Sequence, residues 1–154
     1  ESRGLGDVYK RQGILKANSK QSKFVLSIRA SDVFEIYRVS DDGINRVYVS
    51  PFKHIPKTWK KGGGYAIDYN QSIGGIKNIA VSDDLICFSL FLQNYNEAAK
   101  TDFASNELFC FDWDGNKVKK YVLPFPIGNF CIDGTHIYGV RNFEDKIIIY
   151  RFNM

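Results

Sequence analysis

Three stretches of the chain can be laid over one another, and this internal repetition constrains the fold more than any other feature of the sequence. Each stretch consists of short runs rich in Val, Ile, Phe and Tyr, which alternate with polar residues or are continuously apolar. Asp, Gly, Asn and Ser bound these runs and supply the backbone conformations that tight hairpins need. Repeats of four antiparallel strands, spaced by roughly 40 to 50 residues, are typical of β-propeller blades.

The repeats are not equally complete. Four strand-like runs cover residues 76–123, four more lie within residues 13–50, and only three lie within residues 127–152 before Met154. The sequence therefore predicts an all-β fold, a partial β-propeller of about three four-stranded antiparallel blades in which the last blade lacks its outer strand. The same strands could also form an up-and-down meander in a sandwich or a barrel.

In a propeller the first strand of each blade lies innermost around an axis, and the blades pack face to face. We expect the inward-pointing side chains of the second and third repeats to be buried. These are Ile79, Val81, Phe88, Phe109, Phe111, Phe130, Ile132, Tyr138, Ile148 and Tyr150.

Residues 1–12, ESRGLGDVYKRQ, differ from the rest of the chain. They have no apolar periodicity, no capping box and no apolar core of a signal peptide. The segment resembles the translation of sequencing-adapter read-through, so we interpret it as an artefactual or disordered leader outside the folded core. Residues 13–154 are then the folded domain.

The charge and hydropathy of the chain exclude two classes of partner. The net charge is only +4, and the Lys and Arg residues are scattered beside Asp and Glu. A nucleic-acid-binding protein is expected to gather its basic residues on one face, so we expect no nucleic-acid partner. No apolar run is long enough for a transmembrane helix, so we expect no transmembrane segment.

The three cysteines all lie in apolar, strand-like runs. A free thiol in such a run usually packs as a small hydrophobic side chain, which is what we expect of Cys87, Cys110 and Cys131. A disulfide between Cys87 and Cys110 on neighbouring strands is the alternative. The odd number of cysteines and the absence of CxxC spacing argue against a zinc site.

Three motifs could carry chemistry, but each has a simpler interpretation. The run DWDGN (112–116) resembles the start of a calcium loop, yet the downstream Glu is absent and SDDGIN occupies the equivalent turn of the first repeat, so we interpret it as a hairpin turn. His54 and His136 have no partners at the spacing of a triad or a metal site. The basic loop 53–61 lacks the features of a phosphate-binding P-loop. We therefore expect no catalytic residue, no metal and no cofactor.

Three runs carry a resemblance to a known family. FVLSIRASDVFEIYRVSDDG, GGIKNIAVSDDLICFSLF and ELFCFDWDGNKVKKYVLP, the last followed by CIDGTHIYGV, resemble the C-terminal half of TolB-like six-bladed β-propeller proteins of Gram-negative gut bacteria. The resemblance implies an exported protein, periplasmic or at the cell surface, although no lipobox Cys lies near the start. Because a propeller must close its ring and the third repeat stops after three strands, we also expect Met154 to be the true C-terminus. The outer strand of the last blade and about three further blades would then lie in a missing N-terminal part of the chain.

The longer loops should gather on one face of the propeller. Because antiparallel strands reverse direction, the connection from second to third strand and the connection to the next blade emerge at the same end. The long connections 51–75 and 92–106 and the short segment 124–128 belong to these two classes, whereas the tight turns fall at the opposite end. Loops on rigid scaffolds often carry function, so we expect this end to bind ligand, with contacts from Trp59, Tyr65, Tyr69 and Tyr95.

Two functions compete on this basis. The first is a non-catalytic binding or scaffold propeller that recognises a protein, peptide or glycan. The alternative is a propeller-type hydrolase or lactonase, which needs an inward-facing ring of polar residues around a channel metal ion. Asn78, Asn129 and Asp133 are the nearby candidates for such a ring.

Overall fold

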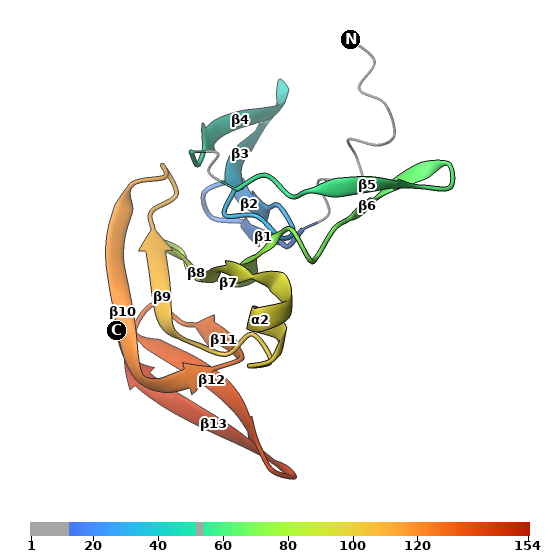
Figure 1. Ribbon diagram of the computed structural model, residues 1–154. Coiled ribbons are helices and arrows are strands. Elements are labelled where there is room, and N and C mark those ends of the chain that lie inside the picture. Colours follow the sequence, from blue (N-terminus) through green and yellow to red (C-terminus); the bar gives the residue numbers. More distant parts are fainter. Residues whose placement is uncertain (1–12, 52–53) are drawn as a thin grey trace.

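The computed structural model describes residues 13–51 and 54–154, and antiparallel sheets dominate this part of the chain (Figure 1). The first sheet, blade 1, contains β1 (Leu15–Asn18), β2 (Lys23–Ser27), β3 (Phe34–Ser40) and β4 (Gly43–Val49). Blade 2 contains β7 (Ile73–Val81), β8 (Ile86–Asn94), β9 (Ser105–Phe111) and β10 (Lys117–Ile127). Blade 3 contains β11 (Asn129–Ile132), β12 (His136–Phe143) and β13 (Lys146–Asn153). The hairpin of β5 (Thr58–Lys61) and β6 (Gly64–Ile67) and the helix α2 (Tyr95–Ala99) lie outside the blades.

The prediction of a partial β-propeller is confirmed. In every blade the spatial order of the strands is their order along the chain, and neighbouring strands are antiparallel. None of the described sheets closes on itself, and the third has three strands where the others have four. The expectation for residues 1–12 lies outside the described residues.

An aromatic cluster joins blades 1 and 2. Alternate residues of β3, Phe34 and Ile36, face blade 2 and are almost fully buried, as are Ile86 and Phe88 of β8. The ring of Phe34 lies 5.1 Å from that of Phe88 and 5.0 Å from that of Phe111. The face-to-face packing follows from strand alternation, which gives each sheet one apolar face toward its neighbour.

A second core, between blades 2 and 3, contains a disulfide. Cys87 of β8 and Cys110 of β9 occupy directly opposed positions, are almost fully buried and are bonded to one another. Our expectation of free thiols at these two positions is therefore wrong, because the strand register brings the thiols together inside the blade. Cys131 is free and exposed, so our expectation of a packed position for it is also wrong, because it lies on the strand face opposite Ile132.

The prediction that ten side chains of the second and third repeats are buried is confirmed for four of them. Ile79, Phe88, Phe111 and Ile132 are buried. The others are half-buried: Val81, Phe109, Phe130, Tyr138, Ile148 and Tyr150.

Strand alternation explains the clearest error in these burial predictions. Ile137, not Tyr138, points toward blade 2 and is fully buried, because successive residues of a strand face opposite sides of the sheet. Phe109 packs on the inner core only at its margin, 6.5 Å from the ring of Phe88.

The DWDGN run is a hairpin turn that docks onto blade 1. Asp112 lies at the start of the turn, where its carboxylate accepts hydrogen bonds from the backbone N–H groups of Asp114 and Asn116. Burial raises the pKa of Asp112, but a hydrogen bond from the side-chain amide of Asn116 and these backbone hydrogen bonds outweigh it and hold the pKa below its usual range. Trp113 is buried, and the buried ammonium of Lys23 contacts its carbonyl oxygen and the carboxylate of Asp114 at 3.0 and 2.8 Å. The turn is therefore a contact between blades.

The outer faces of blades 1 and 3 expose large apolar side chains. The strand pairing places Leu15 and Ile44 on the side of blade 1 that faces away from blade 2, where they are 58% and 63% exposed. Ile147 and Ile149 occupy the corresponding outer side of blade 3 and are also exposed.

In the part of the chain that the structure describes, no helix is long and apolar enough to cross a membrane.

Candidate ligand-binding face

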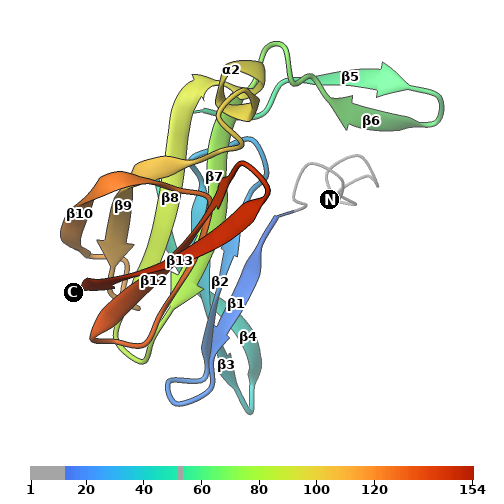
Figure 2. The ribbon, with the colours of Figure 1, turned by 90° about the horizontal axis from the view of Figure 1, so that it is seen from below.

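The long connections gather at one end of the blades. Figure 2 shows α2 and the β5–β6 hairpin at the top of the view, whereas the turns between β1 and β2, β3 and β4, and β7 and β8 lie at the bottom. We call the end with α2 and the hairpin the long-loop face. Its existence follows from the antiparallel strand order.

The connections differ from simple loops. The 51–75 segment contains the β5–β6 hairpin, which projects away from the blades (Figure 1). The 92–106 segment begins with the end of β8 and then forms α2. Asn94, the residue before the helix, caps it by accepting a hydrogen bond from the backbone N–H of Asn96. Residues 124–127 continue β10, so blades 2 and 3 are joined almost directly.

The four predicted aromatic contacts separate into two locations. Trp59 and Tyr65 lie on the projecting hairpin and are 49% and 48% exposed. They are on opposite faces of this hairpin, because Trp59 pairs with Ala66 and Tyr65 with Lys60. The structure therefore does not bring these two side chains to one surface.

Tyr69 and Tyr95 lie together where the blade connection meets α2. Their ring centroids are 4.2 Å apart, and the guanidinium of Arg29 lies 5.5 Å from the ring of Tyr69. The backbone N–H of Tyr95 donates to the carbonyl oxygen of Ser72 at 2.9 Å. Both tyrosines are half-buried and fix the connection against the helix.

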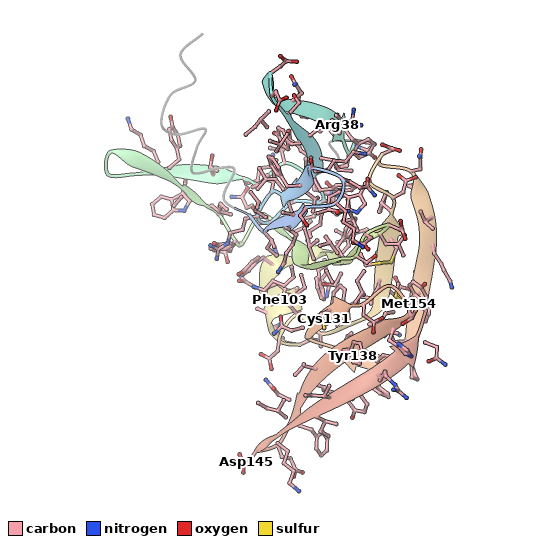
Figure 3. The ribbon with its side chains drawn as sticks, turned by 180° about the vertical axis from the view of Figure 1, so that it is seen from behind. Arg38, Phe103, Cys131, Tyr138, Asp145 and Met154 are labelled. Carbon is pink, nitrogen blue, oxygen red and sulfur yellow. A yellow bond between two sulfur atoms is a disulfide. The ribbon has the colours of Figure 1, made fainter. Side chains whose placement is uncertain are left out.

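A small apolar cluster packs against α2, and one of its rings contacts the side chain of Lys77. Phe103, which follows the helix (Figure 3), packs edge-on against Phe91 with ring centroids 5.6 Å apart, and Ala98 is buried beside them. The ammonium of Lys77 lies 4.2 Å from the centroid of the Phe103 ring. This cation–π contact restrains an otherwise flexible side chain.

A cavity of about 200 Å³ lies where β7 approaches β11 and β12. Its lining consists mostly of polar residues. They are Lys77, Asn78, Thr101, Asp102, Ala104, Gly128, Asn129, Val140, Arg141 and Asn142. Asn78 is anchored here, since its amide donates to the carbonyl oxygen of Gly128 in the next blade.

A second cavity, of about 470 Å³, lies between blades 1 and 2 and shares Lys77 with the first. Gly13, Ile14, Ser27, Arg29 and Ile76 complete its lining. Each blade thus contributes one cation to the two cavities, and these are Arg29, Lys77 and Arg141. Across residues 13–51 and 54–154, none of these three forms an ion pair with a carboxylate.

Sequence reasoning missed these three basic residues. A sequence signal exists for two of them. Arg29 ends the run LSIR and Arg141 ends the run YGVR, and both runs lie in the second-strand region of their repeats. In each run the arginine follows a large, a small and a β-branched residue. Lys77 has no such counterpart, and only the folded structure places it between the other two blades.

The candidates for a channel metal ion are divided between the two ends of the blades. Asn78 and Asn129 line the first cavity, but Asp133 lies in the β11–β12 turn at the opposite end. The backbone N–H and hydroxyl of Thr135 and the backbone N–H of His136 donate to Asp133 and hold its pKa well below the usual range. Among the described residues, no three His, Cys, Asp or Glu side chains are grouped to hold a metal ion.

The stacked four-stranded sheets, with their first strands β1, β7 and β11 toward one side, define a β-propeller architecture. The chain belongs to the TolB-like 6-blade propeller-like family, whose model matches residues 11–135. The search of curated proteins found no match.

Proposed function

We propose that this protein is a non-catalytic binding or scaffold β-propeller that recognises a protein, peptide or glycan through its long-loop face. The observation that carries the proposal is the convergence of Arg29, Lys77 and Arg141, one from each blade, on two neighbouring cavities. Among the described residues these cations have no carboxylate partner, and unpaired cations on a concave surface favour binding of a ligand over a purely structural role.

The aromatic residues of the same face are the proposed outer contacts. Trp59 and Tyr65 supply exposed, rigid rings on a projecting hairpin, which suits them to contact a partner larger than the cavities. Tyr69 and Tyr95 connect this region to Arg29 and therefore support the face from within.

A periplasmic or cell-surface location is part of the proposal. The buried Cys87–Cys110 disulfide supports it, because structural disulfides persist in oxidising compartments and are rare in the cytosol. The family membership is consistent with an exported protein.

The aromatic contacts can be tested by substitution. We expect Trp59→Ala and Tyr65→Ala each to weaken binding of a ligand found in glycan and peptide libraries by at least about tenfold, as for aromatic residues at binding hot spots. Isothermal titration calorimetry measures the affinities. The control is Tyr138→Ala, whose hydroxyl bonds to Asp133 at the other end of the blades. If Trp59→Ala and Tyr65→Ala bound the ligand as tightly as Tyr138→Ala and the unchanged protein do, the hairpin would have no role in binding.

The family fold also supports a larger ring. We propose that further blades of the same kind pack on the outer faces of blades 1 and 3 and complete a six-bladed propeller. The exposed Leu15, Ile44, Ile147 and Ile149 support this arrangement, because apolar faces of this kind normally pack on a neighbouring blade.

The chain as given should therefore self-associate through these faces. We expect size-exclusion chromatography to show dimers or larger species that dissociate on dilution. Ile149→Lys should shift the protein toward the monomer, whereas Leu92→Lys, at an exposed position on β8, should not. A dilution-independent monomer would count against additional blades at these faces.

A further inference from the structure

The cavity between blades 2 and 3 has the chemistry of an anion site. Among the residues that the structure describes, Lys77 and Arg141 line it together with a single carboxylate, Asp102, so that cations exceed anions. Both basic side chains are half-buried, and partial burial strengthens their attraction for an anion by lowering the local dielectric constant. Arg141 can hold a carboxylate or phosphate through two parallel hydrogen bonds.

The rest of the lining is suited to hydroxyl groups. Asn78, Asn129 and Asn142 contribute amides, each with both hydrogen-bond donors and an acceptor, and Thr101 contributes a hydroxyl. In the described part of the chain, Ala104 and Val140 supply the apolar side chains of this lining. A ligand that carries several hydroxyl groups in addition to its charge therefore suits this lining, whereas an apolar peptide side chain would make no use of its amides.

A buried hydroxyl lies on the strand next to one of these lining residues. Ser89 pairs with Asn78 across β7 and β8, is 1% exposed, and its Oγ has no hydrogen-bond partner among the described residues. Buried polar atoms are normally satisfied, by water where no protein group is available. The residue paired with Asn78 on the adjacent strand is thus polar.

We propose that the cavity between blades 2 and 3 binds a sugar that carries an acidic group, either a uronate or a sugar phosphate. This proposal rests on the proposed binding function. Lys77 and Arg141 hold the anionic group, and the amides of Asn78, Asn129 and Asn142 bind the hydroxyls. Lys77 is already positioned by the ring of Phe103, so that binding requires little ordering of its side chain.

The test compares neutral sugars with their acidic derivatives. Glucose and galactose, their uronates and their 6-phosphates are titrated into the full chain, and binding is followed by isothermal titration calorimetry at low and high salt. We expect the acidic sugars to bind at least about tenfold more tightly than the neutral ones, with an advantage that shrinks as salt screens the charges. Preference for the uronate or for the phosphate identifies the source of the anion.

Substitutions locate the binding. Lys77→Gln and Arg141→Gln should each weaken binding of the acidic sugar by about tenfold to a hundredfold, as expected for the loss of one charged hydrogen-bond partner. The matched controls are Lys117→Gln on β10 and Arg151→Gln on β13, both exposed and outside the cavity. Circular dichroism confirms that the variants are folded.

The outcomes separate this inference from the proposed function. Binding of acidic and neutral sugars with equal affinity, or of acidic sugars with no loss in Lys77→Gln and Arg141→Gln, would overturn the acidic-sugar site. So would the absence of any binding of these sugars. The broader proposal of a binding face would fail separately, if no peptide or glycan bound in a manner sensitive to Trp59 and Tyr65.

Discussion

Replacing Cys87 and Cys110 together by alanine should lower the free energy of unfolding by about 2–5 kcal/mol, as is typical for loss of a native disulfide. The bond joins β8 to β9 at the centre of blade 2, so its removal frees the unfolded chain and leaves a space between blades 2 and 3. Urea unfolding followed by circular dichroism measures the change.

A reducing agent provides an independent comparison. It should destabilise the native protein by a similar amount and leave the double variant unaffected. The control is Cys131→Ala, at an exposed position, which should change stability by less than about 0.5 kcal/mol. If the native protein and the double variant unfolded at the same urea concentration, the disulfide would contribute nothing to stability.

Phe34→Ala should lower the free energy of unfolding by about 3–5 kcal/mol, the usual cost of deleting a buried aromatic ring. Phe34 is 1% exposed, and its ring contacts those of Tyr48, Phe88 and Phe111, so its loss leaves a cavity between blades 1 and 2. The same urea titration measures this effect.

Phe143 offers a matched comparison for Phe34. It is 51% exposed on the projecting end of β12, and Phe143→Ala should therefore change stability far less. A loss for Phe34→Ala no greater than that for Phe143→Ala would mean that the interface between blades 1 and 2 does not carry the stability expected of a core.

The β-propeller repeat was predictable from sequence because its signals are local. Alternating apolar residues define strands, and turn residues such as those of DWDGN define where the chain reverses. The grouping of the connections at one face was also predictable, because it depends only on strand direction. Which side chains face the core was harder to predict. A shift of one residue along β12 turns Ile137 instead of Tyr138 toward the core, and only packing against blade 2 selects between the two.

The elements inside the connections were harder to predict. The β5–β6 hairpin has a Gly-rich turn but little apolar alternation, and α2 is too short for a helical pattern to emerge. Their positions depend on contacts with distant residues, such as that of Tyr95 with Tyr69.

The sequence by itself determined the strands, their antiparallel order within each blade and the end at which the long connections emerge, because hydrophobic periodicity and turn chemistry act between residues close along the chain. Only the tertiary structure decided that Cys87 meets Cys110 and that Arg29, Lys77 and Arg141 converge on two cavities. These relations join residues on different strands or blades, and their geometry depends on strand register and on how one sheet packs against the next.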